Sequence, residues 1–97
     1  MRFTFQTTDG RMFFTDAEPK AISDYWKRNK RSIKWCIAKF DSEQLFIWHE
    51  GHKGWQHFPR LDEKAQAVYR RLIKKYYMEA YENGVVMEYV GSLDNQN

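Results

Sequence analysis

The sequence predicts an α+β domain in which two helices pack on one mostly antiparallel sheet. Short stretches that alternate apolar and polar residues predict strands, and two longer stretches with apolar residues at helical spacing predict helices. Along the chain they follow the order β-β-α-β-β-(β)-α-β, which is typical of α+β folds. The 97 residues suit a single domain. We expect this domain to cover residues 1–91 and a frayed polar tail to cover 92–97.

The first predicted element is a hairpin, "RFTFQTTDGRMFFT" (2–15). Asp9 and Gly10 are typical of a two-residue turn, because such turns need positive φ angles. This turn would place Phe5 opposite Phe14. One face of the hairpin would then hold these apolar side chains: Phe3, Phe5, Met12 and Phe14.

A helix is predicted next. Thr15 and Glu18 have the spacing of a capping box, and Pro19 is tolerated in a first helical turn. The helix ends in the basic run "KRNKR" (27–31), where cations suit the negative end of the helix dipole. Its apolar residues recur at helical spacing: Ala17, Ala21, Ile22, Tyr25 and Trp26.

The stretch "SIKWCIAKFDSEQLFIWHE" (32–50) predicts a second hairpin with "DSEQ" as a four-residue loop. In that register Ala38 faces Ile47, and Cys36 faces His49. Both faces of this hairpin carry apolar residues, which indicates a central place in the sheet.

The last elements are a short strand in "WQHF" (55–58), a long helix over 61–83 and a final strand in "VVMEYV" (85–90). Asn83 and Gly84 are typical of a helix C-terminus. One apolar stripe on the long helix is predicted to face the sheet. Its members are Leu61, Ala65, Val68, Tyr69, Leu72, Ile73, Tyr76 and Ala80.

Composition excludes several classes of function. The chain has one cysteine, which forbids an internal disulfide and fits a reducing compartment. It has no apolar run of about 18 residues and no signal-peptide pattern, so we expect a cytoplasmic protein without a membrane partner. Phosphate-binding glycine loops, dinucleotide fingerprints and nucleophile elbows are absent from the sequence. We therefore expect no cofactor and no small-molecule ligand.

All three histidines lie in "FIWHEGHKGWQHFP" (46–59), which has three interpretations. The favoured one is a strand-turn-strand without chemistry. A zinc site is the second, although the spacing matches no standard motif; its ligands would be Cys36, His49, His52 and His57. A small metal-independent ribonuclease is the third, since such enzymes need acid–base groups near one phosphodiester. Its catalytic residues would be His49, Glu50, His52 and His57.

A second stripe on the long helix mixes cations with rings. Arg70, Lys74, Tyr77 and Tyr81 recur at spacings of four, three and four, with Arg71 and Met78 beside them. The basic run adds Lys27, Arg28, Lys30 and Arg31. Cations neutralise phosphates and rings stack on unpaired bases, so the stripe predicts a non-enzymatic protein that binds nucleic acid. Because Tyr, Arg and Met are also enriched at protein interfaces, a regulator or inhibitor that docks on a larger protein is the alternative. A solvated or more widely buried helix remains the simplest interpretation.

Overall fold

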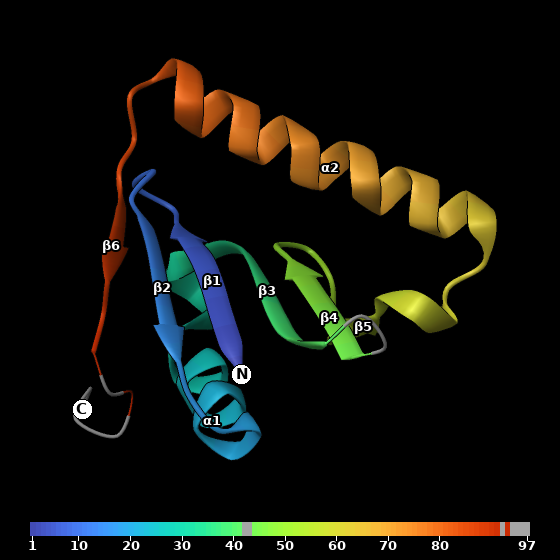
Figure 1. Ribbon diagram of the computed structural model, residues 1–97, viewed down its shortest axis with the longest axis horizontal. Coiled ribbons are helices and arrows are strands. Elements are labelled where there is room, and N and C mark those ends of the chain that lie inside the picture. Colours follow the sequence, from blue (N-terminus) through green and yellow to red (C-terminus); the bar gives the residue numbers. More distant parts are fainter. Residues whose placement is uncertain (42–43, 92, 94–97) are drawn as a thin grey trace.

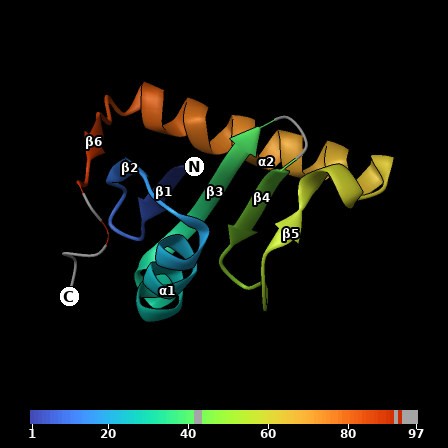
Figure 2. The same ribbon diagram turned by 60° about the horizontal axis from the view of Figure 1, so that its bottom comes forward.

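The computed structural model describes residues 1–41, 44–91 and 93. A six-stranded sheet in the order β5-β4-β3-β1-β2-β6 forms the centre, and the helices α1 and α2 cover opposite faces of it (Figures 1 and 2). All strand pairs are antiparallel except β2 and β6. The predicted α+β fold is confirmed. Its elements are β1 (Arg2–Thr7), β2 (Met12–Asp16), α1 (Pro19–Asn29), β3 (Ile33–Asp41), β4 (Gln44–His49), β5 (Gln56–His57), α2 (Glu63–Glu82) and β6 (Met87–Tyr89), with 3-10 turns at Lys30–Ser32 and Phe58–Arg60.

The α1 side of the sheet holds the apolar core. Ile22 and Trp26, one helical turn apart on α1, pack on the aromatic rows of the sheet, where Phe3 and Phe5 stack with ring centroids 5.1 Å apart. Area burial of this kind is the main stabilising contribution in a small domain. The buried members of this core are Phe3, Phe5, Ile22, Trp26, Ile33, Cys36, Ala38, Trp48 and Leu93.

The α2 side is held by aromatic contacts around one tryptophan. Trp35 stacks on Tyr76 at 5.6 Å between ring centroids, and its indole Nε1 donates to Gln6 Oε1 at 2.8 Å. Helix α2 begins at Glu63, two residues after the predicted start at residue 61, and the carboxylate of its N-cap residue Asp62 accepts a hydrogen bond from the amide of Ala65 at 2.8 Å. Both polar and apolar side chains are therefore buried under α2.

The register of the first hairpin differs from the prediction by one residue. Phe5 lies opposite Phe13, not Phe14. The loop holds three residues rather than two, since the amide of Thr7 donates to the carbonyl of Arg11 at 2.9 Å. A one-residue shift turns a side chain to the other face of the sheet. Two residues expected beside Phe5 therefore lie on the other face of the sheet: Met12, which packs near Tyr76 of α2, and Phe14, which contacts Tyr89.

The predicted register of the second hairpin was also wrong by one residue. Cys36 lies opposite Trp48, not His49. A β-bulge between Lys39 and Asp41 adds one residue to β3 and shifts the pairing. The same shift places Ala38 opposite Phe46 and Trp35 opposite His49. Residues 42–43 of the predicted four-residue loop lie outside the described residues.

The capping box predicted for α1 is also wrong. The N-cap residue is Glu18, without a side-chain cap. Thr15 is still part of β2, and its hydroxyl donates to the carbonyl of Gly91 at 2.5 Å. This bond and the ion pair between Arg11 and Glu88, at 2.9 Å, tie the C-terminal segment with β6 to the sheet.

The predicted tail at 92–97 lies outside the described residues, except for Leu93 in the α1-side core. Neither helix in the described part of the chain has the length and apolarity needed to cross a membrane.

Candidate nucleic-acid interface

Four residues follow the outer face of α2, and we call them the α2 line: Arg71, Lys74, Met78 and Tyr81. Their spacings of three, four and three place consecutive members next to each other on the helix surface. Tyr81 is 82% exposed and Met78 is 48% exposed. Arg71 and Lys74 are exposed, and neither forms an ion pair with any residue that the structure describes. Two cations without an ion pair among the described residues are thus followed along the helix by two accessible, polarisable side chains.

The other two residues of the predicted stripe contact the domain. The guanidinium of Arg70 lies 5.3 Å from the ring centroid of Phe58 and donates to Gln66 Oε1 at 3.3 Å. Tyr77 contacts Trp35, with ring centroids 5.4 Å apart, and is 38% exposed. Burial raises the pKa of its hydroxyl. Part of the Tyr77 ring therefore packs on Trp35, and the rest is exposed to solvent.

The basic run divides between two places. Lys27 and Arg28 belong to the last turn of α1, on the opposite face of the sheet from α2 (Figure 2). Lys30 and Arg31 follow in a 3-10 turn and line a cleft together with residues of the turn after β4. The run and the α2 line thus lie on different surfaces.

Two of the three histidines come together beneath α2. The rings of His49 and His52 have centroids 3.9 Å apart, and His52 Nδ1 lies 3.4 Å from the hydroxyl of Tyr69. Burial and then the positive charge of His52 lower the pKa of His49. His57 stacks instead on Phe46 at 4.6 Å, on the α1 face of the sheet. The four residues of the predicted catalytic set are therefore not assembled into one site.

The sheet also divides the predicted zinc ligands. Cys36 is buried on the α1 side, where burial raises the pKa of its thiol well above the ordinary value. His49 and His52 lie on the other side, next to Tyr69. Among the residues that the structure describes, no three histidine, cysteine or acidic side chains are grouped in a way that would hold a metal ion.

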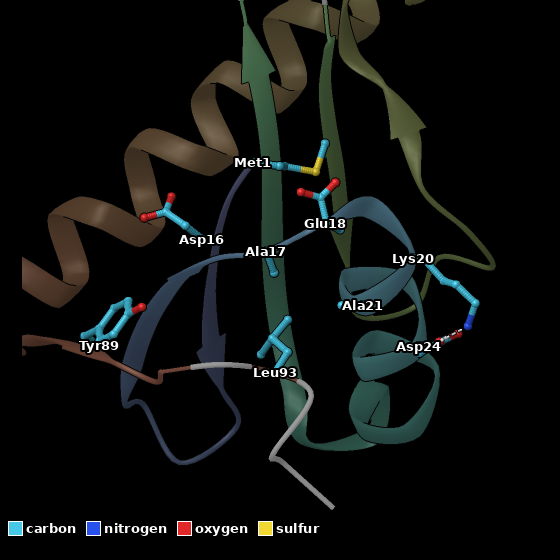
Figure 3. Close-up of a pocket in the computed structure, with 9 residues that line it drawn as sticks. All are labelled: Met1, Asp16, Ala17, Glu18, Lys20, Ala21, Asp24, Tyr89 and Leu93. Atoms are coloured by element: carbon cyan, nitrogen blue, oxygen red, sulfur yellow. Dashed lines mark hydrogen bonds and ion pairs between the residues drawn. The ribbon is translucent and has the colours of Figure 1, made fainter.

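A hollow of about 610 Å³ lies at the start of α1 (Figure 3). Its walls carry the carboxylates of Asp16, Glu18 and Asp24, and the ammonium of Lys20 is paired with Asp24 at 2.8 Å. Carboxylates repel phosphates, so this hollow is unsuited to nucleic acid. Two surfaces in the described part of the chain carry cations without ion pairs: the α2 line and the cleft that Lys30 and Arg31 line.

No protein-family model, curated protein or solved structure matches the chain. Sequence reasoning missed two contacts near the histidines: the hydroxyl of Tyr69 at His52, and the ammonium of Lys34 over the ring of Tyr76 at 5.4 Å. Helical periodicity identifies Tyr69 and Tyr76 as sheet-facing residues. It does not say which end of which strand they meet.

Proposed function

We propose that this protein binds single-stranded nucleic acid through the α2 line. The observation that carries the proposal is that Arg71 and Lys74, which are free of ion pairs within the described residues, share one helix face with the exposed side chains of Met78 and Tyr81. Cations that need not give up a carboxylate partner contact phosphates at little cost, and each contact releases counterions from the nucleic acid.

Tyr81 favours a single strand over a duplex. A ring that is 82% exposed offers its face to an unpaired base, whereas the bases of a duplex are already stacked on each other. Stacking accepts every base, because each has an aromatic face. We therefore expect affinity with little dependence on sequence.

The test is a salt titration of binding to a labelled single-stranded oligonucleotide, followed by fluorescence anisotropy. Replacing Arg71 and Lys74 by Ala removes two phosphate contacts, so the slope of log K against log salt should become shallower by about 1.4. The matched control is Lys27→Ala with Arg28→Ala, which removes the same charge from α1. An equal change of slope in both double variants would contradict binding at α2.

The ring is tested separately. Tyr81→Ala should weaken binding by roughly 1–3 kcal/mol per stacked base without a change in the salt slope, because no charge is removed. Tyr81→Phe keeps the ring and should bind like the wild type. Equal losses in the two variants would assign the role to the hydroxyl and contradict stacking. Absence of any binding at low salt would reject the whole proposal.

A second function is favoured by apolar side chains at the corner between α2 and β6. Val86 is 74% exposed, Tyr89 62% and Met87 38%. Exposed apolar groups next to tyrosine and arginine are typical of protein interfaces, so the second candidate is a regulator or inhibitor that docks on a larger protein. Val86→Ser with Tyr89→Ser should then abolish capture of one defined partner and leave oligonucleotide binding unchanged. The Arg71→Ala and Lys74→Ala variant should do the reverse.

A further inference from the structure

A basic cleft of about 420 Å³ opens at the end of the β3–β4 hairpin, and we call it the hairpin cleft. β4 ends at His49, and the amide of Glu50 donates to the carbonyl of Lys34 at 2.9 Å, so the turn after β4 lies beside the start of β3. The 3-10 turn Lys30–Ser32 precedes β3 and forms the opposite wall. The residues that matter are Lys30, Arg31, Trp48, Glu50, His52 and Lys53.

The wall that carries His52 is held in place. The indole Nε1 of Trp48 donates to the carbonyl of His52 at 2.8 Å. Trp48 is only 5% exposed, so the bond ties an exposed turn to a buried ring. His52 Nδ1 faces the hydroxyl of Tyr69, which leaves Nε2 without a partner among the described residues. His52 thus lines the cleft with its backbone carbonyl bonded to Trp48, while its ring lies beside His49 and Tyr69.

The charge of the cleft is positive. Lys30, Arg31 and Lys53 contribute three cations, and Glu50 is the acid that lines it with them. The ammonium of Lys30 lies 5.3 Å from the ring centroid of Trp26. No carboxylate in the described part of the chain pairs with any of the three cations. Because like charges that converge on one opening repel each other, an anion between them would relieve that repulsion.

We propose that the hairpin cleft binds a phosphate group of a nucleotide or of a nucleic-acid strand. The guanidinium of Arg31 suits two phosphate oxygens at once, whereas the ammonium of Lys53 acts as a point charge. His52 lines the same cleft, so its ring signals should respond when an anion binds there. This site is separate from the α2 line, and its residues come from the α1–β3 and β4–β5 connections.

Two titrations test the cleft directly. Adenosine 5′-monophosphate, with adenosine as the control ligand, is added to the 15N-labelled protein, and NMR signals of the His52 ring and the Trp48 indole are followed. The phosphate site predicts saturable shifts with the monophosphate only. Arg31→Gln with Lys53→Gln should abolish them, while Arg71→Gln with Lys74→Gln should preserve them. Absence of shifts in the wild type, or their persistence in the Arg31 and Lys53 variant, overturns the proposal.

Oligonucleotides with and without a 5′-phosphate then distinguish the two sources of the group. If the cleft takes a terminal phosphate, Arg31→Gln with Lys53→Gln should weaken only the phosphorylated strand, by about tenfold or more. If it takes an internal phosphodiester, both strands should weaken equally. Unchanged affinity for both strands would show that no strand reaches the cleft, so a strand-bound phosphate would be rejected.

These experiments separate the cleft from the α2 line. A protein that binds the monophosphate but no oligonucleotide would refute the proposed function and keep the phosphate site. A protein that binds oligonucleotides through Arg71 and Lys74, but shows no response at His52, would do the opposite. Circular dichroism of each variant confirms that the fold is intact.

Discussion

The two faces of the sheet are packed in different ways. Under α1 the buried side chains are apolar, and rings of Phe3, Phe5 and Trp26 contact one another or their neighbours. Under α2 the buried residues include Thr4 and Gln6, and the helix is held by rings around Trp35. We therefore expect the α1 face to contribute most of the folding free energy. The α2 face contributes less and leaves the outer side of its helix free for a ligand.

The largest effect is expected from Phe5→Ala. Phe5 is 1% exposed and contacts the rings of Phe3, Phe13 and Tyr25. Removing a buried phenyl ring costs about 3–5 kcal/mol of unfolding free energy. That is much of the total for a domain of this size. Urea unfolding at 25 °C measures the loss, and a loss below about 1 kcal/mol would contradict the assignment of the core to this face.

A matched pair of isoleucines compares the faces directly. Ile22 on α1 is 3% exposed, whereas Ile73 on α2 is half-buried. Ile22→Ala should cost about 2–5 kcal/mol, and Ile73→Ala roughly half as much, because less apolar area is buried at the second position. The same urea experiment gives both values. Equal losses would show that the two faces contribute alike.

The effect of pH through His49, on the α2 side, should be smaller. Burial, followed by the charge of His52, lowers the pKa of His49 below its ordinary value of 6.5. The unfolded chain then binds this proton more readily than the folded one. The contribution of His49 to stability is thus complete above pH 6.5 and is lost as the pH falls through the window between 6.5 and the lowered pKa.

His49→Asn should remove this part of the pH dependence. The measurement is the change in unfolding free energy between pH about 7.5 and about 5.5, taken for both proteins under the same buffer conditions. A smaller change in the variant is expected. An identical change would mean that His49 titrates in the folded protein as it does in the unfolded chain.

The smallest effect on stability is expected on the α2 line. Arg71→Ala and Lys74→Ala remove exposed cations that have no ion pair within the described residues. Each should change the unfolding free energy by less than about 0.5 kcal/mol. The thermal midpoint of each variant is the measurement. A large loss at either position would make these cations structural and weaken their assignment to a ligand.

The sequence predicted the order of elements because each signal for it is local. Alternation and helical spacing are read within one segment, and both helix α2 and its exposed cations were found in this way. The two strand registers were not, since a three-residue loop and a bulge after Lys39 each shift pairing by one position. That single shift placed Cys36 beside His49 in the prediction and separates them in the structure.

The hairpin cleft could have been predicted from the sequence. In any hairpin the start of the first strand lies beside the end of the second, so the run before Ile33 must approach the turn after His49. Lys30 and Arg31 thereby meet His52 and Lys53 in either register. The contact of His52 with a residue of α2 could not be foreseen in the same way, because it depends on where the helix crosses the sheet.

The tryptophans make the two faces optically distinct. Trp26 contacts both Trp48 and Trp55 on the α1 side, whereas Trp35 stacks on Tyr76 beneath α2. The tryptophan fluorescence of a variant that keeps Trp35 as its sole indole would therefore come only from the interface between α2 and the sheet. Its fluorescence would follow the docking of α2 in real time. In a variant that lacks Trp35 instead, the other three indoles would follow the unfolding of the α1 side.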